Sequence, residues 1–483
     1  MCVLSPQRKS AQALLLLSII LYLVLTILIG VWAARKVKTL DDYMLAGRSL
    51  PLMLSSTAMF ATWFGSETVF GASSQFLEGG LYSVIEDPFG AALCLILFGL
   101  FFVRKLYNLN LLTLGDFFRR RFGKKAELTA SIFLGPPYLG YIAAQLVAMG
   151  LIMNVVTGMQ VWEGIVISAI VVTLYTYIGG MWAITITDFI QTIIIIGGLL
   201  VLAIVMGMKA GGVTNVLTQA PEGTFRFFPP LDLKEIVSWI AAWAVLGLGS
   251  IPSQDVFQRS MSSNSATTAV RSCFIAAAMY LTIAMLPLFI SLCTKHLYPA
   301  QIEGDAQLAL PNMVLQHTTL PVQILFFGSL LSAIMSTTSS VLLAPAAILS
   351  ENLVKPLWKN RLSNKQILLI TRIAVLIFSA AATIMATMRS NIYELVGESS
   401  ILSLVSLFAP LTFGLYWKRS SKVGAMASMV VGMLSWIIFE AYEISWPTLV
   451  PATLLSIAAM IIGSLGWPDK EENDDKDRAQ SIE

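Results

Sequence analysis

A chain of 483 residues that is 56% hydrophobic and only 12% charged is not an ordinary soluble protein, because soluble domains carry about 25% charged residues. Its mean hydropathy of +0.76 indicates a polytopic membrane protein. The net charge of +3 argues against nucleic-acid partners, and the four cysteines do not make a disulfide framework.

The first apolar run, residues 11–34, is too long for the core of a signal peptide, which has about 7–15 residues. We therefore expect it to be a retained transmembrane span. Twelve further runs of spanning length lie near residues 51–79, 86–103, 126–154, 160–178, 184–207, 235–252, 270–293, 318–349, 366–388, 393–416, 421–440 and 444–466. Barrel strands would be short and alternate in polarity, so helices are expected here. The sequence predicts an all-α polytopic membrane protein with about 13 transmembrane helices.

Lysine and arginine residues are distributed unevenly over the two sides that thirteen spans define. Twenty of them fall in connections on one side and seven on the other, with Arg259 counted on the richer side. Cytoplasmic connections carry the excess of positive charge. We therefore expect a location in the cell membrane, with the N-terminus outside and the C-terminus in the cytoplasm. The polar tail, residues 468–483, predicts a disordered cytoplasmic end.

The second predicted span contains the segment "ATWFGSETVFGA", residues 61–72, which places polar and flexible groups at membrane depth. The groups that interrupt it are Trp63, Gly65, Ser66, Glu67 and Thr68. A carboxylate near the middle of a span is costly unless it is paired or faces a water-filled cavity. The segment therefore indicates a polar site.

Asp188, in "TITDFIQ", lies at the start of the sixth predicted span. It can cap a helix at the membrane surface or face a site at depth, and both interpretations stay open at this point. The seventh span, within residues 244–266, is interrupted by two glycines and a proline.

Interrupted spans in equivalent positions of two halves indicate an inverted-repeat transporter core. The second and seventh spans lie five apart, which predicts a five-plus-five core whose first and sixth helices are broken. The expected organisation is an N-terminal end, first helix and loop (1–50), a first repeat (51–207), a second repeat (208–416) and two peripheral helices (417–467) before the tail.

The ninth predicted span contains "SAIMSTTSS", residues 332–340, with a dense cluster of hydroxyls. Ser336, Ser339 and Ser340 share one helix face. Such hydroxyls can instead bond to their own helix or join helices together. Hydroxyls, a carboxylate and the free carbonyls of a broken helix suit a small hard cation, and sodium fits better than a transition metal because clusters of His and Cys are missing.

Several segments resemble motifs of the sodium:solute symporter family. They are "DDYMLAGRSLP" (41–51), "NLLTLGDFFRRRFG" (110–123), "LYTYIGGMWAITITDFIQ" (174–191), "FQRSMSSNSA" (257–266) and "SAIMSTTSSVLLAPAAILSENL" (332–353). The matches run from about residue 41 to residue 419, nearly the whole chain. The resemblance implies the five-plus-five inverted-repeat fold and sodium as the coupling ion.

The resemblance also implies which residues bind sodium. The first site would use carbonyls of the broken helix and a pattern on the hydroxyl-rich helix, which correspond here to Ala61, Phe64, Ala333, Ser336 and Thr337. Some members bind a second ion, and the matching residues are Ser336, Ser339, Ser340 and Asp188. One or two sodium ions per cycle are therefore expected.

Within the family, "ATW" (61–63) and "GSIPSQDVFQRSMSSNSAT" (249–267) are most similar to the high-affinity choline transporter branch. That branch holds a quaternary ammonium between aromatic rings by cation–π contact. Trp63 and Tyr141 match cage positions, whereas Ser253 stands where the branch has a tryptophan. The candidate substrate-binding residues are Trp63, Ser66, Glu67, Thr68, Glu86, Tyr141 and Ser253.

These observations predict a sodium-coupled secondary active symporter that imports a small organic solute by alternating access. The solute would be choline or another organic cation or amine. The alternatives are a symporter for proline, another amino acid or a monocarboxylate, and a membrane solute sensor without transport. An enzyme is not expected, since no nucleophile–base pair or metal-ligand cluster lies at membrane depth. The expected partners are the solute, sodium ions and membrane lipid, and no obligatory protein partner is indicated.

Overall fold

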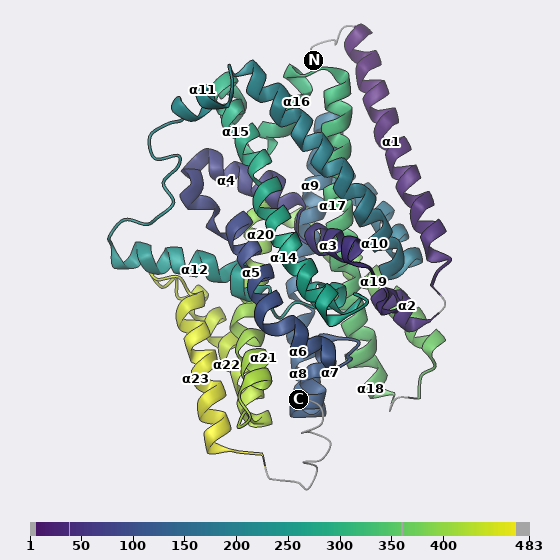
Figure 1. Ribbon diagram of the computed structural model, residues 1–483, viewed down its shortest axis with the longest axis vertical. Helices are drawn as coiled ribbons and strands as arrows, with labels where there is room; N and C mark the ends of the chain where they lie inside the picture. The colour runs from purple at the N-terminus through teal and green to yellow at the C-terminus, as the bar shows by residue number, and fades with distance from the viewer. Residues whose placement is uncertain (1–5, 38, 359–360, 470–483) are drawn as a thin grey trace.

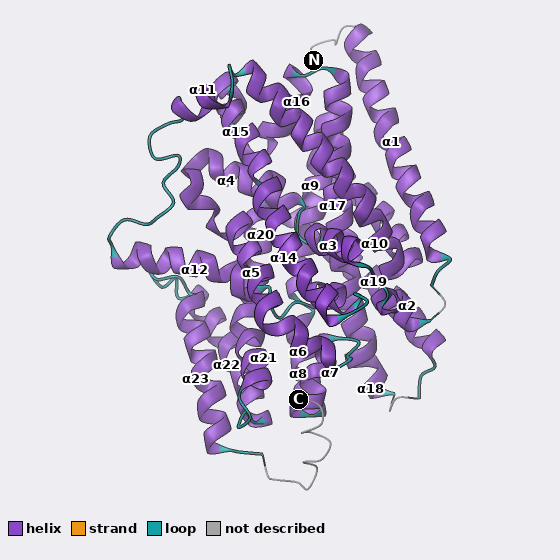
Figure 2. Cartoon of the chain, in the orientation of Figure 1, coloured by secondary structure: helices purple, strands orange, loops and turns teal. Residues whose placement is uncertain are grey.

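The computed structural model describes residues 6–37, 39–358 and 361–469. In this part of the chain the secondary structure consists of helices joined by loops, and no strand is present (Figure 2). The predicted all-α class is therefore confirmed.

The α-helices follow one another along the chain with these bounds: α1 Pro6–Ala34, α2 Leu40–Leu45, α3 Leu52–Ala61, α4 Ala72–Gly79, α5 Ala91–Leu97, α6 Val103–Asn108, α7 Leu114–Phe122, α8 Lys124–Leu134, α9 Pro137–Thr157, α10 Val161–Lys209, α11 Val213–Thr218, α12 Leu233–Gly249, α13 Gln254–Met261, α14 Ala266–Ile283, α15 Met285–Leu297, α16 Ala309–His317, α17 Leu320–Ile348, α18 Lys355–Leu357, α19 Asn364–Met388, α20 Ile392–Ser403, α21 Ala409–Tyr416, α22 Lys422–Ala441 and α23 Leu449–Gly466. Tighter 3₁₀ or wider π turns connect some of them: η1 Ala46–Arg48, η2 Glu67–Gly71, η3 Gly80–Val84, η4 Ile85–Gly90, η5 Phe98–Phe102, η6 Pro299–Ile302, η7 Ala306–Leu308, η8 Leu349–Val354 and η9 Leu404–Phe408.

Ten helical segments of the described chain are long and apolar enough to cross a membrane, and eleven if α12 and α13 count as one bent span. One of the ten runs from Glu67 to Asn108 and joins parts of two predicted spans. The shorter apolar helix Leu52–Ala61 is the first part of the predicted span 51–79, and the predicted span 160–178 corresponds to the shorter apolar helix Val161–Leu174. The number of thirteen crossings therefore stays a prediction.

The first predicted break lies where the sequence places it. Helix α3 ends at Ala61, and helical structure resumes in η2 at Glu67. A Cβ atom on Gly65, between them, would come within 2.7 Å of both Gln145 Oε1 and Thr337 Oγ1. Only glycine lets the unwound chain approach these two side chains so closely.

The second break separates α12 from α13. The chain turns by 47° between Gly249 and Gln254, and this bend interrupts the seventh predicted span. Both broken core helices are thus present, so the prediction of two interrupted helices is confirmed.

Helix α10 contains two predicted spans in one helix with a sharp bend. At Gly180 the backbone has φ +55° and ψ −162°, far from helical values. A Cβ atom there would lie 2.5 Å from the ring of Tyr43. Both the left-handed backbone and the close contact require glycine at this position.

Helices α10 and α17 pack against each other at the centre of the molecule, and α1 packs against α10 (Figure 1). Helices α22 and α23 pack against each other on the side away from α1 (Figure 1). They lie in residues 417–467, for which the sequence predicts two peripheral helices. Helix α1 begins at the upper end of the molecule and α23 ends at the lower end. The predicted disordered tail lies from residue 470 onward outside the described residues.

Candidate ion and solute sites

The end of α3 meets the hydroxyl-rich part of α17. Ser336 Oγ and Thr337 Oγ1 each donate a hydrogen bond to the carbonyl oxygen of Ala61, at 3.4 Å and 3.2 Å. Phe64 and Ala333 are buried as well. The structure thus brings Ala61 together with both predicted hydroxyl ligands.

This group of atoms suits an alkali cation. Its possible ligands are one carbonyl oxygen and two hydroxyl oxygens, and oxygen is the ligand that hard cations prefer. The helix does not continue past Ala61, so the Ala61 carbonyl has no partner in its own helix and is available to an ion. Ala61, Ser336 and Thr337 therefore fit the predicted first sodium site.

Asp188 lies in α10 beside the same face of α17, and it is fully buried. Its Oδ1 atom accepts a hydrogen bond from Ser336 Oγ. Ser339 Oγ and Ser340 Oγ both donate to the Ser336 carbonyl, at 2.9 Å and 2.8 Å. The carboxylate thus bonds to side chains of other helices, which favours a site over a helix cap. The four predicted second-site residues lie together.

Arg259 completes this group, and its predicted place in a cytoplasmic connection is wrong. It lies in α13 with 1% of its surface exposed. Its guanidinium forms an ion pair of 3.2 Å with Asp188, contacts Ser340 Oγ and donates to the carbonyl of Ala58 at 2.7 Å. A guanidinium on this carboxylate occupies part of the coordination space that a second sodium ion would use.

A small cavity of about 30 Å³ lies between the two breaks. It is lined by Trp63, Pro137, Tyr138, Tyr141, Gly249, Ser250, Ser253, Asp255, Ser399, Ser400 and Ser403. The buried carboxylate of Asp255 accepts hydrogen bonds from Trp63 Nε1 at 3.1 Å and from the Tyr138 hydroxyl at 2.7 Å. The cavity therefore combines aromatic rings, hydroxyls and one carboxylate.

The family model of the sodium:solute symporters matches residues 43–432. The chain belongs to the sodium:solute symporter family. It is 30% identical over 442 residues to the high affinity choline transporter 1 of Homo sapiens, with 86% of this chain and 75% of that protein covered. It is 28% identical over 443 residues to the high-affinity proline transporter PutP of Bacillus subtilis, with 86% and 89% covered.

Solved structures agree on the fold. A sodium-coupled sialic acid symporter in a substrate-bound outward-open state superposes with a TM-score of 0.83 at 19% identity, covering 95% of this chain and 99% of that one. Mhp1, a nucleobase-cation-symport-1 family transporter, superposes with a TM-score of 0.56 at 15% identity, covering 90% and 98%. The comparisons confirm the predicted fold class and a sodium-coupled secondary active symporter in the membrane.

The seven predicted substrate-binding residues lie in two separate groups in the structure. Trp63, Tyr141 and Ser253 line the cavity. The others, Ser66, Glu67, Thr68 and Glu86, do not line it. Glu67 and Glu86 belong with Asp87 to a separate acidic group, and Thr68 Oγ1 donates to Asp87 Oδ2 at 2.6 Å. Ser66 donates its backbone N–H to Gln145 Oε1 at 3.0 Å.

Sequence reasoning missed Tyr138 and Asp255 as cavity residues. Both carry a signal that could have been used. Tyr138 lies three positions before Tyr141 and so shares its helix face, and Asp255 lies two positions after Ser253 at the start of α13. A carboxylate at a predicted helix break is a candidate for a ligand contact.

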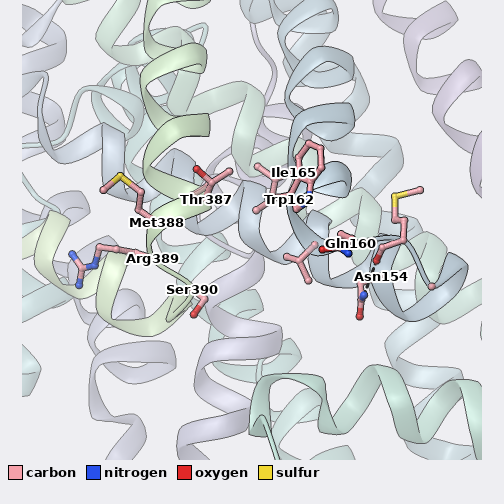
Figure 3. Close-up of a pocket in the computed structure, with 12 residues that line it drawn as sticks. Asn154, Gln160, Trp162, Ile165, Thr387, Met388, Arg389 and Ser390 are labelled. Atoms are coloured by element: carbon pink, nitrogen blue, oxygen red, sulfur yellow. Dashed lines mark hydrogen bonds between the residues drawn. The ribbon is translucent and has the colours of Figure 1, made fainter.

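The symporter has to widen this cavity to hold an organic solute. A volume of about 30 Å³ accommodates roughly two water molecules. A larger open cavity, of about 570 Å³, lies where the loop between α9 and α10 meets the end of α19 (Figure 3). None of the predicted site residues lines it.

Breaking the buried ion pair of the symporter should reduce its stability. Asp188→Asn leaves the Arg259 guanidinium buried without an anionic partner, which typically costs about 3–5 kcal/mol. We expect a large drop in the thermal unfolding temperature of the purified protein in detergent. The double variant Asp188→Asn/Arg259→Gln should recover much of the loss, and a single variant as stable as the natural protein would contradict the pairing.

Proposed function

We propose that this symporter uses the sodium gradient to import a small organic cation. The observation that carries the proposal is the buried carboxylate of Asp255 in the wall of the cavity between the two breaks. The cavity-lining residues, all of them described, include no Lys, Arg or His. A cationic solute would supply the missing positive charge.

The cavity offers two kinds of contact to such a solute. The faces of Trp63 and Tyr141 can attract a cation by cation–π interaction, worth about 2 kcal/mol or more when water is excluded. Asp255 adds a charge-assisted hydrogen-bond acceptor for an ammonium N–H. Ser253 takes the place of the tryptophan expected from the family resemblance, so fewer rings surround the cation and the carboxylate carries more of its recognition.

A zwitterionic amino acid is the second candidate. Ser253 is the N-cap residue of α13 and lines the cavity, so the N-terminus of this helix could receive a carboxylate group while Asp255 receives the ammonium. The similarity to proline transporters supports this candidate, as the similarity to choline transporters supports the first.

The first break would couple the ion to the solute. Ala61 contacts the hydroxyl ligands of α17, and Trp63, two residues later, bonds to Asp255 in α13. Occupancy of either site then favours the arrangement in which both sets of contacts are made. We propose one coupled sodium ion at the first site and a second ion only if Arg259 withdraws from Asp188. The distribution of basic residues supports an N-terminus outside the cell and a C-terminus in the cytoplasm.

The solute can be identified by a binding screen on the purified protein. Thermal stabilisation would be measured with and without sodium for choline, betaine, small primary amines, proline, other amino acids, pantothenate, sugars and short carboxylates. A true substrate stabilises the folded protein in proportion to its occupancy. We expect sodium-dependent stabilisation by a cation, and stabilisation by monocarboxylates or sugars alone would contradict the proposal.

Removing the indole of Trp63 should affect the solute more than the ion. In Trp63→Ala the cavity loses a cation–π face and the donor to Asp255 Oδ2. We expect the affinity for the stabilising solute to fall at least about tenfold, which corresponds to about 1.4 kcal/mol, with a smaller change in sodium affinity. Titrations of solute and of sodium measure the two effects, and a larger effect on sodium would assign Trp63 to packing around the ion.

A further inference from the structure

A second acidic group lies beside the first break, outside the solute cavity, and two of its three carboxylates are buried. It comprises Glu67 of η2 with Glu86 and Asp87 of η4. Glu67 has 2% of its surface exposed and Asp87 has none. The two interact electrostatically with each other, and both belong to segments that pack together.

Two carboxylate oxygens of this group receive no hydrogen bond from the described residues. Asp87 Oδ2 accepts from Thr68 Oγ1 at 2.6 Å, and Thr68 Oγ1 lies 2.6 Å from the Tyr280 hydroxyl. Asp87 Oδ1 and Glu67 Oε1 are both buried, and no described residue donates to either atom. Buried acceptors without a donor need an explanation, and a bound proton, ion or water would supply one.

No described Lys, Arg or His forms an ion pair with Glu67, Glu86 or Asp87. The nearest titratable groups on the surrounding helices are uncharged or acidic: Tyr141 of α9, Tyr280 of α14, Tyr393 of α20 and, facing Tyr141, Asp255 of α13. Other charged groups on the adjoining elements have other partners or are exposed. Lys295 donates to the Leu77 carbonyl, Arg389 pairs with Glu394 and Glu398, Glu235 accepts from the Tyr82 hydroxyl and Asp305 accepts from the backbone N–H of Gln307. Glu78, Lys234 and Arg271 are exposed.

Neighbouring buried carboxylates cannot all stay ionised without a cation, because each unpaired charge costs several kcal/mol. The described residues contain no group of three or more His, Cys, Asp or Glu side chains placed to hold a metal ion. We propose that Glu67 and Asp87 form a proton-binding site beside the hinge. The proton removes one of the buried negative charges and turns that carboxyl into a hydrogen-bond donor.

The proton enters and leaves through the break itself. Glu67 begins the helical turn that follows Thr62–Ser66, so movement of this hinge would expose the carboxyl to water. The proton then passes to water and one carboxylate becomes ionised, with only an O–H bond broken and formed. The site needs no bound solute, and it can exist whether or not the proposed substrate class is right.

Infrared spectroscopy of the purified protein in lipid tests the proposal directly. The natural protein should show the C=O stretching band of a protonated carboxyl that persists at neutral pH. The double variant Glu67→Gln/Asp87→Asn should remove intensity equivalent to one carboxyl group, whereas each single variant leaves a carboxyl that can keep the proton. The matched control Glu78→Gln changes an exposed carboxylate and should leave the band unchanged.

Absence of the band at neutral pH from the natural protein would overturn the proposal without any variant, so the test survives a variant that does not fold. A band of full intensity in the double variant Glu67→Gln/Asp87→Asn would also overturn it, because the proton would then lie elsewhere. Loss of sodium coupling or of solute binding would concern the proposed function and leave this result untouched.

Discussion

The double variant Ser336→Ala/Thr337→Ala should need far more sodium than the natural symporter. Both hydroxyls contact the Ala61 carbonyl at the end of the broken helix, so the variant removes two of the oxygen ligands assigned to the first ion. Contacts between a polar group and a charge contribute about 1.5–3 kcal/mol each. We expect the sodium concentration for half-maximal thermal stabilisation to rise at least about tenfold.

Thr338→Ala is the matched control for this experiment. Thr338 is buried in the same helix, but its hydroxyl donates to the carbonyl of Ile334 one turn earlier at 2.5 Å. Its loss should leave the sodium titration unchanged within about twofold. An unchanged titration in the double variant would remove Ser336 and Thr337 from the ion site.

Asp255→Asn should reduce the affinity for a cationic solute while it preserves the shape of the cavity. The amide retains one oxygen that can accept from Trp63 or Tyr138, but the negative charge is lost. A charge-assisted hydrogen bond is worth about 1.5–3 kcal/mol. We expect binding of an organic cation to weaken by about tenfold to a hundredfold, and sodium binding to change little.

Glu222→Gln serves as its control, because it removes one negative charge from an exposed residue between α11 and α12. Isothermal titration with the cation that stabilises the protein best measures both variants. If Asp255→Asn binds that cation as tightly as Glu222→Gln, the carboxylate does not recognise the charge of the solute.

Much of the fold could be predicted because the lipid bilayer imposes simple rules on the sequence. Long apolar runs have to be helices, and groups such as Gly65 and Glu67 stand out only because they violate the pattern. The hydroxyl cluster of α17 was predicted for the same reason. The structure places Ser336 and Thr337 against the Ala61 carbonyl, as the motif implies.

The tertiary pairings could not be predicted, because they join residues far apart in the sequence. Arg259 lies in a polar segment that the sequence predicts as a loop. In the structure it belongs to the buried helix α13 and pairs with Asp188, 71 positions away. Trp63 and Asp255, 192 positions apart, meet only when both broken helices are assembled. At the bend of α10, Gly180 likewise lies against Tyr43, which is far away in the sequence.

Uptake of a labelled organic cation into vesicles that contain the purified symporter tests the central claim most directly. An inward sodium gradient, with potassium substituted for sodium as the control, should drive accumulation of a cation such as choline above its outside concentration. Asp255→Asn vesicles should accumulate less. Equal uptake in the two gradients would contradict sodium coupling, and sodium-driven uptake of proline but of no cation would contradict the substrate class.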